Sequence, residues 1–126
     1  MRPDAIRILM ADDDPFVRDM VGFILESSDY TVETAENGRE ALEKYKAGSG
    51  FHVIISDMNM PEMDGRALIR EVRSIDPDIP IILLTGTDDA ASAKSGADEC
   101  IVKDENIQDA ITASVDAVLR RKGLVS

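Results

Sequence analysis

Three consecutive aspartates, Asp12, Asp13 and Asp14, follow the apolar run Ile6–Met10 and directly precede Pro15. Like charges at close range repel, and burying even one unpaired carboxylate is costly. The three side chains therefore need a compensating partner, or they have different roles. Asp14 stands where a helix N-cap is expected, because proline is favoured at the first helical position. This leaves Asp12 and Asp13 as the pair available for chemistry.

The composition is that of one acidic globular domain, which we expect to span residues 1–126. Apolar residues make up 44% of the chain, and the net charge is −11. This acidity argues against nucleic-acid binding by the domain, because phosphate contact needs a basic face. It is compatible with basic partners or with a divalent cation. The apolar runs are too short to span a bilayer and no signal peptide is evident, so we expect a cytoplasmic protein without a membrane role.

The elements that must position the aspartates alternate along the chain. Apolar and β-branched runs predict five strands, at Ile6–Ala11, Thr31–Ala35, Val53–Ser56, Ile81–Leu84 and Glu99–Val102. Helical spacing with caps and stops predicts helices at Pro15–Ser28, from Asn37 to Gly48, from Asp64 to Pro77, at Asp88–Ser95 and from Ile107 to Gly123. Strands that are apolar throughout and joined by helices imply a parallel sheet covered on both faces. The most apolar strand, Ile81–Leu84, is predicted to be central.

Ligands of open α/β sheets bind beyond the carboxyl ends of the strands, so the residues directly after each strand are the informative ones. These residues are Asp12 and Asp13, Asp57, the triplet Thr85-Gly86-Thr87, and Lys103. Convergence of the strand ends would bring several carboxylates, a hydroxyl and one ammonium group into a single cleft.

This set resembles the active site of the response-regulator receiver domains of two-component signalling. Four signals occur in the family's order: the pair Asp12-Asp13, the stretch DMNMPEMDG that begins at Asp57, then Thr85, then Lys103. The resemblance covers essentially the whole chain. It implies a flavodoxin-like, doubly wound α/β fold with a five-stranded parallel sheet in the order 2-1-3-4-5 and five helices, the fourth of them short.

The resemblance also implies a phosphoacceptor and a metal site. Asp57 is expected to accept a phosphoryl group from a histidine of a kinase. Asp12, Asp13, Asp57 and the backbone carbonyl of Asn59 are expected to hold Mg²⁺, with Asp13 a direct ligand, because Mg²⁺ prefers hard oxygen ligands. The expected partner is a sensor histidine kinase or a phosphotransfer protein.

Further residues of the set would act on the phosphoryl group. The resemblance implies that Lys103 pairs with a phosphoryl oxygen and that the Thr85 hydroxyl turns toward it to report phosphorylation. Gly86 would leave room for the phosphodonor. Asn59 and Thr87 hold positions that modulate the lifetime of the phosphoryl group, in a direction that the sequence does not give.

The chain departs from the family pattern in its last third. Lys103 is followed by Asp104 where the family usually has proline after a cis bond. A cis bond before a non-proline residue costs about 2.5–4 kcal/mol, so we expect a trans bond in a reshaped loop or a strained exception. Lys103 should still reach the site, but less firmly, because Asp104 and Glu105 bring negative charge beside it.

The segment thought to read out phosphorylation is unusual as well. Cys100 holds the position of the family's switch tyrosine or phenylalanine. The span from Thr85 to Lys103 is about one helical turn shorter than is common, which predicts a stunted helix at Asp88–Ser95. In this family the fourth helix, the fifth strand and the fifth helix usually form the signalling face and often the dimer face. We therefore expect phosphorylation without the family's common dimer through this face, and a monomer.

Cys100 and His52 are expected to have structural roles. Cys100, the only cysteine, allows no intramolecular disulfide and is predicted to be a small, semi-buried residue. His52, the only histidine, stands at the entry to the third strand, away from its carboxyl end.

The leading interpretation is a phosphorylation-dependent regulatory module rather than a turnover enzyme. One alternative is a degenerate receiver that binds partners without phosphorylation. Another is a Mg²⁺-dependent phosphohydrolase, although Asn59 stands where that class often has a second acid. A flavin carrier is disfavoured because aromatic residues make up only 4% of the chain. The sequence does not separate a stand-alone receiver from the N-terminal part of a longer protein.

Overall fold

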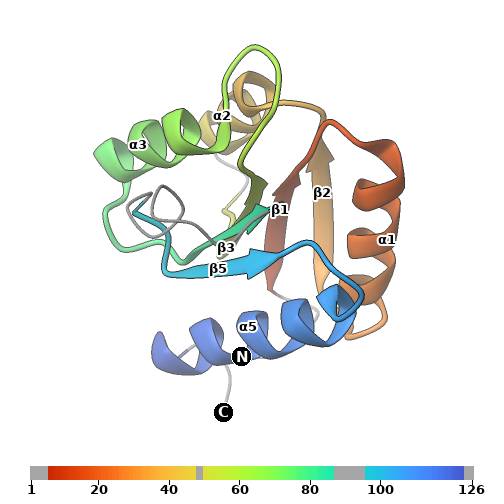
Figure 1. Cartoon of the computed structure of the whole chain (residues 1–126). Helices are drawn as coiled ribbons and strands as arrows, with labels where there is room; N and C mark the ends of the chain where they lie inside the picture. Colours follow the sequence, from red (N-terminus) through yellow and green to blue (C-terminus); the bar gives the residue numbers. More distant parts are fainter. Residues whose placement is uncertain (1–5, 48–49, 87–95, 124–126) are drawn as a thin grey trace.

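The computed structural model describes residues 6–47, 50–86 and 96–123, which form strands and helices (Figure 1). The strands are β1 (Arg7–Ala11), β2 (Thr31–Ala35), β3 (Val53–Asp57), β4 (Ile81–Thr85) and β5 (Glu99–Val102). The helices of the described residues are α1 (Pro15–Glu26), α2 (Gly38–Lys46), α3 (Gly65–Ile75) and α5 (Ile107–Arg121). The helix expected at Asp88–Ser95 lies outside the described residues.

The five strands form one parallel sheet in the order β2-β1-β3-β4-β5, as expected. The sheet register places Asp57 beside Leu84, and Thr85 beside Val102. Asp57 and Thr85 therefore lie together where the carboxyl ends of the strands meet, which we call the carboxyl edge of the sheet. The prediction that Ile81–Leu84 is the central strand is wrong, because β3 holds the centre and β4 lies next to it. Both strands are fully buried, so apolar character alone does not distinguish their places.

Helices cover the sheet on both faces, with α1 and α5 on one side and α2 and α3 on the other (Figure 1). Two hydrophobic clusters match this division. The first joins the sheet to Val21 of α1 and to Ile111 and Val115 of α5. The second joins it to Leu42 of α2 and Leu68 of α3. A sheet packed in this way leaves its carboxyl edge as the natural place for a site.

Three helices begin with side-chain caps, and those at Asp14 and Asn37 were expected from the sequence. Asp14 accepts a hydrogen bond from the Phe16 N–H at 2.9 Å, with Pro15 in the first helical turn. Asn37 and Asp64 cap α2 and α3 in the same way. Each carboxylate or amide oxygen satisfies a backbone N–H that has no partner inside its helix. The assignment of Asp14 as a cap is therefore confirmed.

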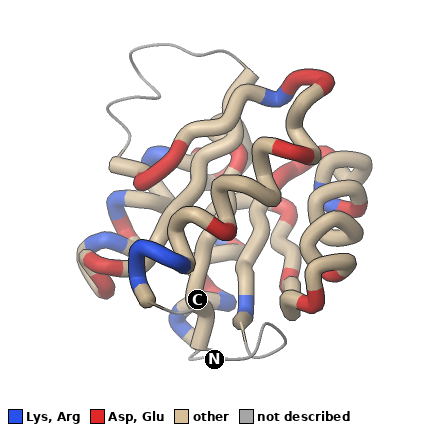
Figure 2. Tube along the Cα trace, turned by 90° about the horizontal axis from the view of Figure 1, so that it is seen from below, with Lys and Arg blue, Asp and Glu red and all other residues tan. Residues whose placement is uncertain are grey.

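Charged residues are spread over the surface, with acidic residues in the majority (Figure 2). A basic stretch lies where α5 ends and includes Arg120 and Arg121. Positive charge at a helix C-terminus is favourable for the helix dipole. Within the described residues, no helix has the length and apolar character needed to cross a membrane.

Cys100 and His52 differ in how they fit the expectations. Cys100 is exposed rather than semi-buried, so that prediction is wrong. The reason is that β5 is an edge strand, in which Cys100 alternates with the buried Ile101. His52 lies at the start of β3, and its Nδ1 accepts a hydrogen bond from the Arg7 N–H at 3.0 Å. This contact is at the end of the sheet opposite to Asp57.

Candidate functional site

Asp12 is fully buried where β1 ends, and the start of α1 holds it in place. Its Oδ1 accepts a hydrogen bond from the Asp14 N–H at 2.9 Å, and Arg18 donates to its backbone carbonyl at 2.8 Å. Its other oxygen, Oδ2, lies 2.8 Å from the Lys103 ammonium group and forms an ion pair with it. A cation that binds Oδ2 would have to displace this contact.

Lys103 joins the ends of three strands. Its backbone N–H donates to the Thr85 carbonyl at 2.8 Å. Its ammonium group contacts Asp12 and also lies 2.9 Å from Oδ1 of Asp57. The peptide bond to Asp104 is trans, as is every peptide bond of the described residues. Of the two expected outcomes, the trans bond is therefore the observed one, and Lys103 still reaches the carboxylates.

The pKa values of Asp57 and Lys103 are both raised, but for different reasons. Burial raises the pKa of the Asp57 carboxyl, Lys103 offsets part of this, and the charge of Asp12 adds to it. Burial alone would lower the pKa of Lys103, but Asp12 and Asp57 together raise it. The lysine thus stays charged, while the Asp57 carboxylate is less favoured than a solvated one. Added positive charge at this edge would stabilise the ionised form of Asp57.

Asp13 completes an acidic cluster with Asp12 and Asp57. One carboxylate oxygen from each of the three lies within 4.8 Å of the others. Asp12 and Asp57 are buried, whereas Asp13 is exposed and faces solvent. Three hard oxygen donors at this spacing fit a cation such as Mg²⁺, which also keeps several waters as ligands.

The remaining predicted residues surround this cluster less closely. Thr85 is buried at the end of β4, directly before Gly86. Gly86 is exposed, and a Cβ added to it would meet no atom within 4 Å. Asn59 is exposed in the loop after β3, and its carbonyl as a metal ligand stays a prediction. Thr87 lies outside the described residues.

Arg18 is a residue of the site that the sequence did not indicate. It stands in α1 and holds the backbone carbonyl of Asp12, while its guanidinium group lies 4.0 Å from Glu36. A single arginine on an amphipathic helix has no pattern that distinguishes it from a solvated one. Its role in orienting Asp12 is visible only once α1 is placed against β1.

Gly65, the first residue of α3, packs against the backbone of Asp57. Its N–H donates to the Met58 carbonyl at 2.9 Å, and a Cβ added to it would collide with the Asp57 carbonyl oxygen. The collision is with backbone, which cannot move aside as a flexible side chain can. Glycine at this position therefore lets the start of α3 pack directly against the end of β3.

We expect Gly65→Ala to lower the free energy of unfolding by about 1–3 kcal/mol, the usual cost of overpacking. The measurement is urea unfolding followed by circular dichroism. Gly86→Ala is the matched control, because its Cβ would meet open space. Equal losses in the two variants would show that the contact with Asp57 does not limit the stability.

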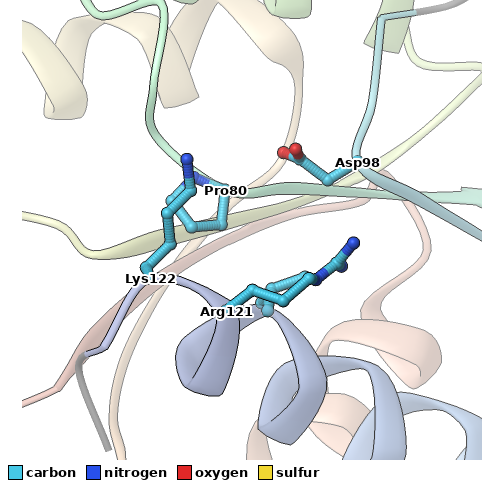
Figure 3. A pocket seen from close by; sticks show the side chains of 5 residues that line it. Pro80, Asp98, Arg121 and Lys122 are labelled. Atoms are coloured by element: carbon cyan, nitrogen blue, oxygen red, sulfur yellow. The ribbon is translucent and has the colours of Figure 1, made fainter.

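A separate pocket lies at the opposite end of the sheet (Figure 3). Its lining includes Pro80 and Asp98, which precede β4 and β5, and Arg121 and Lys122 at the end of α5. The carboxylate of Asp98 already accepts hydrogen bonds from Arg73 and from the Ile81 N–H. This pocket shares no residue with the acidic cluster and is not part of the site.

The fold and the site together define a flavodoxin-like α/β protein with an acidic cluster and a lysine at the carboxyl edge of its sheet. The model of the response regulator receiver domain matches residues 8–115. The chain belongs to this family, the receivers of two-component signalling, and the expectation from its motifs is confirmed.

Individual relatives agree with this assignment. The response regulator MprA of Mycolicibacterium vanbaalenii is 36% identical over 120 residues, which cover 92% of this chain and 51% of MprA. The chain thus spans about half the length of that relative. The response regulator TrrA of Thermotoga maritima, solved in complex with Mg²⁺-BeF, has a TM-score of 0.83 and 37% identity, covering 90% of this chain and 99% of TrrA.

A third relative is a receiver carried by a kinase. The signal receiver domain of a signal transduction histidine kinase from Syntrophus aciditrophicus has a TM-score of 0.82 and 35% identity. The match covers 95% of this chain and 94% of that one. Similar receivers therefore occur in response regulators and in a histidine kinase.

Proposed function

We propose that this chain is a phosphorylation-activated receiver in which Asp57 accepts a phosphoryl group from a histidine in a Mg²⁺-dependent reaction. The observation that carries the proposal is the position of the Lys103 ammonium group, which lies within 2.9 Å of Asp57 and 2.8 Å of Asp12 in a cluster of three carboxylates. A lone acidic cluster would suit cation binding only. A fixed ammonium group beside the candidate nucleophile also offers charge to an incoming phosphoryl group.

In the proposed step, a carboxylate oxygen of Asp57 attacks the phosphorus of a phosphohistidine. The O–P bond forms as the P–N bond breaks, the electron pair leaves with the imidazole nitrogen, and that nitrogen takes up a proton. Asp12, Asp13 and Asp57 would hold Mg²⁺, with Asp13 on the open side. When bound, the ion supplies positive charge that screens the phosphoryl oxygens from the carboxylates.

Lys103, Thr85 and Gly86 have supporting roles in this proposal. Lys103 would move its ammonium group from the carboxylates to a phosphoryl oxygen, a short displacement from its present contacts. The Thr85 hydroxyl would then follow the phosphoryl group and change the surface offered to partners. The open space beside Gly86 supports the approach of a bulky donor. We propose that the chain is a regulatory switch rather than a turnover enzyme. We also propose that it acts in the cytoplasm.

The test is incubation of the chain with acetyl phosphate and Mg²⁺, followed by intact-mass measurement. One phosphoryl group per chain, formed only with Mg²⁺, supports the proposal. No adduct under these conditions favours the degenerate receiver. Rapid multiple turnover on phosphate esters favours the phosphohydrolase.

The proposed donor is a sensor histidine kinase or a phosphotransfer protein. Phe16 lies two residues after Asp14 and is 73% exposed. We propose Phe16 as an apolar contact of that donor.

We expect Phe16→Ser to slow phosphorylation by the protein donor while leaving phosphorylation by acetyl phosphate unchanged. Truncation of an apolar contact at the centre of an interface typically lowers affinity by about tenfold or more. The measurement compares initial rates with both donors. Ile75→Ser, which removes an exposed apolar residue from the end of α3, is the control. Equal slowing with acetyl phosphate would place Phe16 in the chemistry instead of the docking.

A further inference from the structure

The turn between β5 and α5 is built around one exposed residue, Asp104. Its Oδ1 accepts a hydrogen bond from the Asn106 N–H at 2.9 Å, and its backbone carbonyl accepts from the Ile107 N–H at 3.1 Å. Its own N–H donates to the Val102 carbonyl at 3.0 Å. Asn106, which precedes α5, makes no side-chain cap. Asp104 therefore accepts hydrogen bonds from the N–H groups of Asn106, directly before α5, and of Ile107, its first residue.

The residues at the two ends of this turn, Lys103 and Ile107, are both held in place. Lys103 is tied to β4 through its N–H and the Thr85 carbonyl, and its side chain reaches Asp12 and Asp57. Ile107 is buried in the hydrophobic cluster that α5 shares with the sheet. The turn thus sets the direction in which the chain leaves Lys103. The Asp104 side chain accepts the one side-chain hydrogen bond described in this turn.

From these contacts we infer that Asp104 is a positioning residue for Lys103. Its side chain holds the trans turn in the shape that keeps the ammonium group between the two carboxylates. Without this hydrogen bond the turn gains alternative conformations, and Lys103 spends less time on the acidic pair. The inference rests on the proposed function only for its consequence on phosphoryl binding, because the position of Lys103 can be measured without it.

A less firmly held Lys103 should change the affinities for Mg²⁺ and for beryllofluoride differently. The Lys103 ammonium group occupies Oδ2 of Asp12 and Oδ1 of Asp57, so it competes with a cation for the same oxygens. A less firmly held Lys103 should leave the affinity for Mg²⁺ unchanged or higher. The same change should weaken binding of beryllofluoride, the acyl-phosphate mimic, because its negative charge loses a cationic partner. A merely destabilised fold would lose both ligands.

The experiment compares the wild-type chain with Asp104→Ala, Asp104→Asn and Glu105→Gln. Asparagine keeps the acceptor oxygen and removes the charge. The Glu105 side chain is exposed and makes no hydrogen bond or ion pair with the described residues, so Glu105→Gln removes a neighbouring charge without touching the turn. Calorimetry gives the affinity for Mg²⁺ alone and for beryllofluoride in saturating Mg²⁺. A crystal structure of Asp104→Ala gives the position of Lys103.

We expect Asp104→Ala to bind beryllofluoride about tenfold more weakly, the size expected when one charge-assisted contact is lost. Its affinity for Mg²⁺ should not fall, and Asp104→Asn and Glu105→Gln should bind both ligands like the wild type. An Asp104→Asn variant as weak as Asp104→Ala would assign the effect to charge and overturn the inference. So would an Asp104→Ala structure in which Lys103 keeps both carboxylate contacts. If the wild type bound no beryllofluoride, the proposed function would fail, and the crystal structure and the Mg²⁺ affinity would still decide the inference.

Discussion

Asp57→Asn should form no phosphoryl adduct with acetyl phosphate and Mg²⁺, while keeping the fold of the wild type. The amide has the shape of the carboxylate but no anionic oxygen to attack phosphorus. Although only 6% of Asp57 is exposed, its surroundings should tolerate the change, because the amide has the same shape and Lys103 keeps its contact with Asp12. Intact-mass measurement gives the adduct, and circular dichroism gives the fold.

The control for this variant is Asp14→Asn, which changes a carboxylate at the same edge of the sheet but keeps an oxygen that can cap α1. It should form the adduct at the wild-type rate. Persistent labelling of Asp57→Asn would mean that another group is the nucleophile. Asp13 would be the first to test, because its carboxylate is within 4.8 Å of Asp57 and is exposed.

The elements of this fold could be predicted closely from the sequence because its strands are buried on both faces. A parallel sheet between two helix layers gives short apolar runs with sharp polar ends. The predicted bounds Thr31–Ala35 and Glu99–Val102 are those of β2 and β5. The caps Asp14 and Asn37 were predicted for a similar reason, since each acts within its own turn.

The features that could not be predicted depend on contacts between distant segments. The central place of β3 is decided by how the crossovers run, and β4 is as apolar as a central strand would be. The exposure of Cys100 follows from the edge position of β5. The hold of Arg18 on Asp12 requires α1 to be packed against β1. In each of these cases the local pattern fits more than one tertiary environment.

The candidate site has some features that could be predicted from the sequence and others that could not. Its residue types were predicted because the carboxyl ends of parallel strands converge on one edge. The contact of Lys103 with both Asp12 and Asp57 is a finding of the structure, since a lysine after a strand is usually solvated. The turn at Asp104 is a second finding. The negative charge of Asp104 suggested interference with Lys103, whereas its carboxylate is bonded to the N–H of Asn106.

Asp13→Ala should impair Mg²⁺ binding and Asp14→Ala should impair stability, although the two residues are adjacent aspartates. The Asp13 carboxylate lies in the acidic cluster, whereas the Asp14 carboxylate caps α1. Asp13→Ala should abolish Mg²⁺-dependent phosphorylation and weaken Mg²⁺ binding by more than about 100-fold, since even the partners of metal ligands are worth about 10–100-fold. Its stability should not fall, because Asp13 is exposed and its charge adds to the repulsion at Asp57.

Asp14→Ala should instead lower the free energy of unfolding by about 0.5–2 kcal/mol, the cost of losing a cap, and should keep the affinity for Mg²⁺. Calorimetry with Mg²⁺ and urea unfolding of both variants measure the two effects side by side. Equal loss of Mg²⁺ binding in the two variants would contradict this division of roles. The three aspartates can follow one another because their charges have different partners: Lys103 pairs with Asp12, α1 with Asp14, and solvent or a bound cation with Asp13.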